Sequence, residues 1–134
     1  EEALSKALHY SATNFHSVIL LSEGNTYKAK SLPVFAQLGP INKSINMDVN
    51  GDGNLDVVAA GNNYAAEVET IRYDGGRGVV LLGDGKGGFE QLAPNQSGFH
   101  ETNDCKDMVL VNFGANKLII SVSNRDKAKT FLLN

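Results

Sequence analysis

Short apolar segments separated by turn residues make up most of this chain. After residue 9, runs rich in Val, Ile, Leu, Phe and Tyr recur, and Gly, Asn, Asp and Pro stand between them. Such runs favour β-strands, and these turn residues favour hairpins, because they adopt the backbone angles that tight turns need. Residues 1–9 have apolar positions at helical spacing, but only for about two turns. The pattern predicts an all-β fold preceded by a short helical or irregular segment.

The segments also recur in the same order after about 61–63 positions. An apolar run, a glycine turn, an aromatic residue and a proline follow one another twice. The matching pairs are Leu21 with Leu82, Tyr27 with Phe89, and Pro33 with Pro94. The segment around residues 48–56 is repeated more weakly at residues 106–124. A third copy of the first hairpin starts at residue 130.

A repeat of two hairpins has the size of one four-stranded blade of a β-propeller with a loop insertion. We therefore expect about two antiparallel four-stranded blades within one domain, residues 1–134. Two blades cannot close a ring, and repeat units need neighbours to bury their faces. The chain is then a portion of a longer protein, which its opening Glu1–Ala3 without Met also indicates. The alternative is a small β-sandwich whose halves are similar by accident.

The most specific motif is the Asp-rich loop 48–56. Oxygen donors stand at alternate positions: Asp48, Asn50, Asp52, Asn54 through its backbone carbonyl, and Asp56. Calcium takes about six to eight oxygens, and a tightly curled loop presents alternate residues to one centre, with Gly53 at the sharp turn. Three carboxylates this close repel one another strongly without a cation between them. The loop predicts a Ca²⁺ site, and its alternative is an Asx-rich turn without an ion.

Other metals and another calcium motif fit less well. Magnesium prefers fewer protein ligands, and transition metals prefer His or Cys, which this loop lacks. An EF-hand needs Glu at the twelfth loop position and flanking helices. The twelfth position is Ala59, and the flanking segments 45–47 and 57–60 are typical of strands. The sequence therefore excludes an EF-hand.

These residues resemble the FG-GAP or VCBS-type repeat, the calcium-loop repeat of integrin α-subunit propellers and of many bacterial surface and secreted proteins. The likeness covers most of residues 15–124 and lies in loop 48–56, the following strand 57–62 and the hairpin 81–89. It implies a β-propeller, a structural calcium ion held by the five loop residues, and an extracellular, cell-surface or periplasmic location. The second repeat departs from the pattern, because residues 111–117 lack carboxylates. No ion is expected there.

Composition excludes several classes of partner. The chain has 134 residues, a net charge of -3 and 20% charged residues, which is too mildly acidic for a nucleic-acid partner. Apolar runs such as Val79–Leu82 are far shorter than the roughly 18 residues that cross a bilayer. We expect neither nucleic-acid binding nor membrane insertion.

No catalytic constellation is visible in the sequence. The glycine-rich segment 83–88 lacks the residue order of a phosphate-binding P-loop and predicts a hairpin turn. His9, His16 and His100 are not at metal-ligand spacing, and no Gly-x-Ser-x-Gly elbow occurs. Cys105, the single cysteine, predicts a small buried thiol.

The segment from residue 62 to residue 77 is longer than an ordinary hairpin loop. Long loops on rigid scaffolds often carry binding residues. The candidates for a recognition surface are Glu67, Glu69, Arg72, Tyr73 and Asp74. The alternative is a solvated loop that an Arg72–Asp74 contact merely orders.

The sequence thus predicts a calcium-stabilised module that binds an extracellular protein or glycan and does not itself catalyse a reaction. Neighbouring blades or another copy of the chain would complete the fold. One alternative is the propeller portion of a secreted glycan-active enzyme whose catalytic residues lie outside this chain. Another is a spacer with no ligand of its own.

Overall fold

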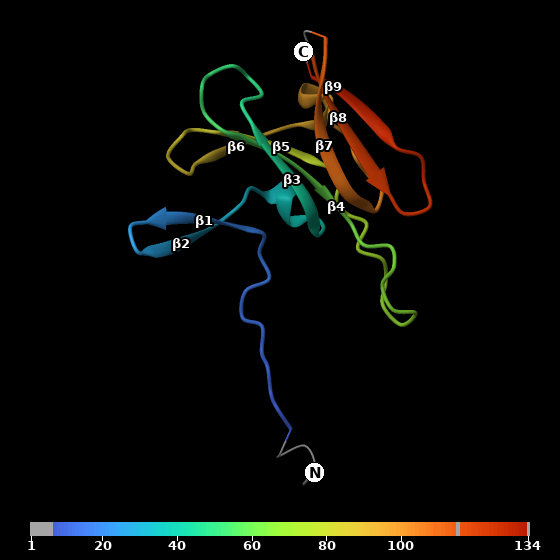
Figure 1. Cartoon of the computed structure of the whole chain (residues 1–134). Coiled ribbons are helices and arrows are strands. Elements are labelled where there is room, and N and C mark those ends of the chain that lie inside the picture. Colours follow the sequence, from blue (N-terminus) through green and yellow to red (C-terminus); the bar gives the residue numbers. More distant parts are fainter. Residues whose placement is uncertain (1–6, 115, 134) are drawn as a thin grey trace.

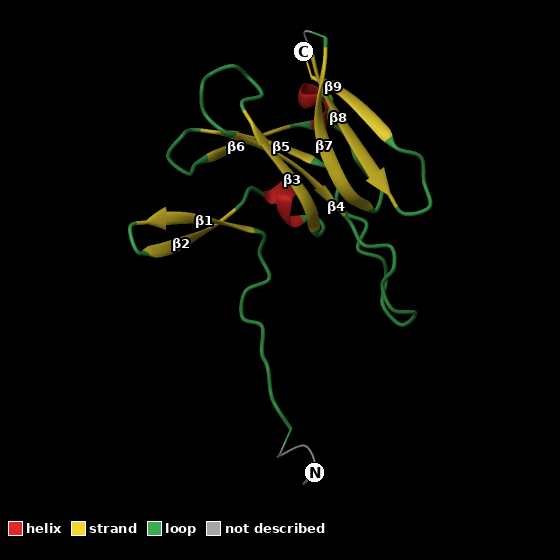
Figure 2. Cartoon of the chain, in the orientation of Figure 1, coloured by secondary structure: helices red, strands yellow, loops and turns green. Residues whose placement is uncertain are grey.

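The computed structural model describes residues 7–114 and 116–133, and its regular secondary structure is almost entirely antiparallel β-strand (Figure 2). Its elements are β1 (Val18–Glu23), β2 (Thr26–Ser31), η1 (Val34–Gln37), β3 (Ile41–Met47), β4 (Asp56–Gly61), β5 (Val79–Gly83), β6 (Phe89–Leu92), α2 (Pro94–Ser97), β7 (Cys105–Phe113), β8 (Asn116–Ser123) and β9 (Lys129–Leu133). The predicted all-β class is confirmed. Most of the N-terminal segment with helical spacing lies outside the described residues, and residues 7–9 form no helix.

The strands form three open sheets in which neighbours in sequence are neighbours in space (Figure 1). Their orders are β1-β2, β3-β4-β5-β6 and β7-β8-β9. Within the described residues only the middle sheet has four strands, so two four-stranded sheets are not observed. The hairpins β3-β4 and β7-β8 are each followed by a further antiparallel strand, β5 and β9 respectively.

The middle sheet is covered on both faces. Val58 and Val80 point into a core shared with the β7-β8-β9 sheet. The other fully buried members of this core are Ala60, Phe99, Cys105, Met108 and Ile119. Ala59 and Leu81, one position further along each strand, point the opposite way into a second core with Ala36 of η1, because successive strand residues face opposite sides. The β7-β8-β9 sheet therefore packs on one face of the middle sheet and η1 packs on the other, while the β1-β2 hairpin extends to one side (Figure 1).

A register shift occurs at the same place in both repeats, at residues 41–43 of β3 and residues 105–107 of β7. The extra residue in β3 is Asn42, whose Nδ2 donates to the carbonyl oxygens of Asn62 at 2.8 Å and Cys105 at 2.9 Å. The start of β3 is thereby joined to the start of β7.

The β1-β2 hairpin is attached mainly through Gln37 at the end of η1. Its Nε2 donates to the carbonyl oxygens of Ser17 and Leu32, both at 2.9 Å, and its Oε1 accepts from the Ser17 N–H at 2.8 Å. Three backbone groups at the base of the hairpin are satisfied by this one half-buried amide. Within the described part of the chain, no helix is long and apolar enough to span a membrane.

Candidate functional site

The Asp-rich loop 48–56 connects β3 to β4 at one end of the middle sheet. Asp48 organises its first half: one carboxylate oxygen accepts the Gly51 N–H at 2.7 Å, and the other accepts the Gly53 N–H at 2.9 Å. Both glycines have positive φ, 80° and 86°, where other residues are strained. The loop is therefore already curled around the Asp48 carboxylate.

Asp52 is held by its neighbours in the same bend. Its Oδ1 accepts the Asn54 N–H at 2.7 Å, and its Oδ2 accepts from Asn50 Nδ2 at 3.1 Å. These hydrogen bonds, first that of the Asn54 backbone and then that of the Asn50 side chain, lower the pKa of Asp52 below its ordinary value. The carboxylate is consequently ionised at neutral pH.

Asp56 has a role that the sequence did not reveal. It is completely buried, and its two oxygens accept backbone N–H groups from different elements, Val49 at 2.7 Å and Gly83 at 2.8 Å. The first bond closes the loop, and the second joins it to the end of β5. The local spacing of the motif does not predict a contact with the distant Gly83, so only the fold reveals this hydrogen bond.

The donor set fits a hard divalent cation. It consists entirely of carboxylate, amide and carbonyl oxygens, which calcium prefers. Each carboxylate oxygen described above accepts one N–H, and an ionised carboxylate has about four acceptor sites in all, so capacity for a cation remains. Within the described residues, no three Asp, Glu, His or Cys side chains converge into a group that would hold a metal. The carboxylates of the loop bind amide groups instead.

The glycine-rich segment 83–88 forms the β5-β6 turn, so the predicted hairpin is confirmed. Asp84 accepts the N–H groups of Lys86 and Gly88, both at 2.7 Å, and these bonds lower the pKa of its carboxyl. The Asp84 N–H donates to the Gly88 carbonyl at 3.0 Å, which closes the turn. All of these contacts are satisfied within the hairpin itself.

The predicted recognition residues lie together on the long loop between β4 and β5, and all are exposed. The residues concerned are Glu67, Glu69, Arg72, Tyr73 and Asp74. A backbone bridge between Asn63 and Tyr73, with bonds of 2.9 and 3.1 Å, narrows the base of the loop. No Arg72–Asp74 ion pair forms within the described residues. The Arg72 guanidinium instead lies 5.1 Å from the centroid of the Tyr64 ring.

Asn62 anchors this loop, and the sequence analysis missed it. The residue is fully buried with φ of 82°. Its Nδ2 donates to the carbonyl oxygens of Gly76 and Thr102, both at 2.9 Å, and its Oδ1 accepts the Gly76 N–H at 2.9 Å. One signal was present in the sequence, because Asn is one of the few residues that tolerate positive φ in turns.

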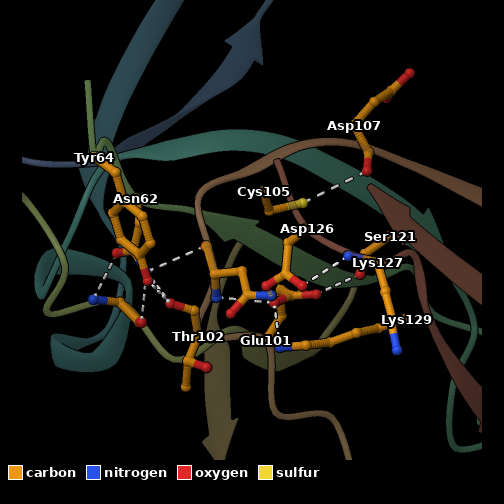
Figure 3. A network of polar contacts seen from close by, with 12 residues as sticks. Asn62, Tyr64, Glu101, Thr102, Cys105, Asp107, Ser121, Asp126, Lys127 and Lys129 are labelled. Carbon is orange, nitrogen blue, oxygen red and sulfur yellow. Dashed lines mark hydrogen bonds and ion pairs between the residues drawn. The ribbon is translucent and has the colours of Figure 1, made fainter. Parts of the chain in front are cut away.

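A buried polar network lies beside the loop anchor (Figure 3). The Glu101 carboxylate accepts hydrogen bonds from Ser121 Oγ, from Lys129 Nζ at 2.8 Å and from the Asn103 N–H at 2.9 Å. Burial, followed by the nearby Glu101 charge, raises the pKa of Cys105 to about 11. The prediction of a buried thiol is confirmed, and this thiol is protonated at neutral pH.

No protein-family model, curated protein or solved structure matches this chain. The likeness to the calcium-loop repeat therefore stays a prediction that depends on the residues of the chain itself.

Proposed function

We propose that this chain is part of a calcium-stabilised β-propeller that displays loops for binding an extracellular protein or glycan. The observation that carries the proposal is the oxygen-rich loop 48–56, which is curled in advance and joined to β5 through the buried Asp56. The location that accompanies such a module is extracellular, on the cell surface or periplasmic.

The arrangement of the sheets supports the propeller. Blades of a propeller are four-stranded antiparallel meanders that pack face to face. The β3-β4-β5-β6 meander has this form. In Figure 1 it lies between the β1-β2 hairpin and the β7-β8-β9 meander. In the repeat of the sequence, β1-β2 corresponds to β5-β6, and β9 corresponds to β5. The two outer sheets are thus the second half of one blade and the first three strands of another.

The outer face of the β7-β8-β9 sheet supports the need for a neighbour. Side chains of this sheet alternate, so that Met108 and Ile119 are buried against the middle sheet. Large apolar side chains exposed on its strands are Val109, Val111, Phe113, Val122 and Leu132. A contiguous exposed apolar patch marks an interaction surface. A neighbouring blade, or another copy of the chain, would bury this face.

The calcium ion would be held by the side chains of Asp48, Asn50, Asp52 and Asp56 and by the backbone carbonyl of Asn54. Its contribution when bound is positive charge that removes the repulsion among the three carboxylates. The side chains of the chain hold the loop in place: Asp48 stabilises its curled conformation, and Asp56 joins the loop to the end of β5. The ion therefore stabilises the end of the middle sheet, where the hairpins meet.

Thermal unfolding with calcium and with EDTA tests this proposal. At a calcium concentration about 100 times the dissociation constant, binding to the folded state should increase the free energy of unfolding by about 2.7 kcal/mol. This increase corresponds to a rise in Tm of about 10 °C. Asp52→Asn should lose most of this gain, and magnesium should reproduce little of it. Identical melting curves of the unmodified chain in calcium and in EDTA would refute the structural role of the ion.

A further inference from the structure

A cavity of about 650 Å³, open to solvent, lies between the long loop and the turn that joins β8 to β9. Its polar lining residues are Tyr64, Arg72, Asp104, Asn124, Arg125 and Asp126. Loop and turn come from different repeats and lie on the same side of the molecule in Figure 1. The cavity therefore exists only because the two sheets are packed together. Its volume is in the range of small-molecule sites, about 300–1,000 Å³.

Two guanidinium groups in this cavity have no acidic partner within the described residues. Arg72 lies over the Tyr64 ring. The Tyr64 hydroxyl donates to the Thr102 carbonyl at 2.7 Å (Figure 3). The ring is thereby fixed, and it positions Arg72 without occupying its N–H groups. Arg125 has φ of 60°, a left-handed conformation that is unfavourable for a residue with a side chain. Both arginines can offer their planar N–H forks to a ligand.

The acids that line the cavity are occupied by other groups. Asp126 accepts from Asn103 Nδ2 and from the Lys127 N–H, both at 2.7 Å. Asp104 is buried, and Lys106 Nζ lies 2.6 Å from its Oδ1. Neither carboxylate neutralises the arginines, but each retains lone pairs for a hydroxyl donor. Donors for an anion and acceptors for hydroxyl groups therefore face one space.

We propose that this cavity binds a sugar acid of the uronic acid class. The guanidinium groups of Arg72 and Arg125 bind its carboxylate, because paired N–H donors match the two oxygens of a carboxylate. Asn124 and Asp126, which are both exposed, bind its hydroxyl groups. An acidic peptide side chain supplies a carboxylate but no such set of hydroxyls, and the cavity is much larger than a bare anion. This inference rests on the proposed function and names the ligand class and site for it.

Titration of the isotope-labelled chain in calcium buffer, followed by NMR, tests the inference with three probes: glucuronate, glucose and a glutamate-rich peptide. Glucuronate should give saturable shifts at residues around the cavity, and glucose should bind at least about tenfold more weakly, since it lacks the carboxylate. Arg72→Ala and Arg125→Ala should each weaken glucuronate binding about tenfold or more. Lys86→Ala removes an exposed cation on the β5-β6 turn and should leave binding unchanged. The same spectra verify that each variant is folded.

Absence of glucuronate binding would overturn the inference, and so would binding of glucuronate by both arginine variants as tightly as by the unmodified chain. Peptide binding that depends on the arginines, without glucuronate binding, would also overturn it in favour of a protein ligand. The calcium proposal is judged separately by melting temperature. If Tm depends on calcium but glucuronate does not bind, only the proposed sugar site is refuted. If glucuronate binds but EDTA has no effect on Tm, only the proposed role of the ion is refuted.

Discussion

Glu101 shows how one residue makes stability depend on pH. Its carboxylate is 1% exposed. Burial by itself would raise its pKa, but hydrogen bonds from Lys129, Ser121 and the Asn103 N–H bring the pKa below the ordinary value of 4.5. A carboxyl with a depressed pKa in the folded state stabilises the fold above its unfolded pKa. That stabilisation is lost as the pH falls through the folded value.

Replacing Glu101 by Gln should therefore reduce the free energy of unfolding at pH 7 by about 1–3 kcal/mol, since charged hydrogen bonds are lost. Between pH 7 and 5 the difference from the unmodified chain should be constant. Below pH 4.5 it should shrink, because the unmodified chain then loses the same interactions. Urea unfolding across this range measures the effect, and a constant difference down to pH 2 would contradict it.

Asn62 allows backbone strain to be separated from hydrogen bonding. Asn62→Ala removes the bonds to Gly76 and Thr102 and keeps a Cβ at φ of 82° without the polar side chain that lets Asn tolerate this angle, so it should reduce the free energy of unfolding by about 3 kcal/mol or more. Asn62→Gly loses the same bonds but accepts this φ, and it should be about 1 kcal/mol more stable than the Ala variant. Chemical unfolding of both variants gives the comparison. Equal stabilities would show that φ is not a constraint at this position.

At the level of elements, the calcium loop and the β5 strand form one unit through Asp56. Neither the β3-β4 hairpin nor the β5-β6 hairpin contains this contact alone, since the carboxylate binds Val49 in the loop and Gly83 at the end of β5. The loop is thus part of the sheet even without a metal. Its conformation and the stability of the sheet are coupled.

Asp56→Asn should be destabilising even in EDTA. Both oxygens of Asp56 accept N–H groups, so an amide places its own NH₂ against one of these donors, at a cost of about 2–3 kcal/mol. Asp52→Asn is the matched control, because Asp52 is exposed and its substitution should change stability in EDTA by about 0.5 kcal/mol or less. Calorimetry of the two variants in EDTA decides the point. Equal melting temperatures would mean that Asp56 acts only through the ion.

For the whole molecule, the decisive feature is the exposed apolar face of the β7-β8-β9 sheet. Val109 is 52% exposed and Phe113 is 68% exposed on β7. We expect this chain, taken alone, to self-associate through that face as its concentration rises. Val109→Glu should shift it to monomer while changing its stability by about 0.5 kcal/mol or less.

Analytical ultracentrifugation over a range of concentrations measures this association. Val34→Glu is the control, because Val34 is an equally exposed valine on η1, at 60%. An equal loss of association in both variants would point to non-specific hydrophobic contact. A chain that is monomeric without substitution would contradict the prediction.

Local patterns in the sequence were sufficient for the features that arise within one hairpin. The turn at residues 83–88 and the curled start of the Asp-rich loop follow from Gly, Asp and Asn at particular positions, since their backbone angles and hydrogen bonds involve near neighbours. The all-β class follows from short apolar runs between such turns.

The remaining features depend on residues far apart in the chain. Asp56 binds Gly83, Asn62 binds Thr102, and Arg72 and Arg125 line the same cavity. A buried carboxylate or amide forms hydrogen bonds with the donors or acceptors that the packing of the sheets places beside it. The free-energy cost of leaving it unpaired is larger than most local conformational preferences. The sequence by itself determined the strands, the turns and the oxygen-rich loop. Only the tertiary structure decided which polar groups are buried together, because that depends on how the sheets pack.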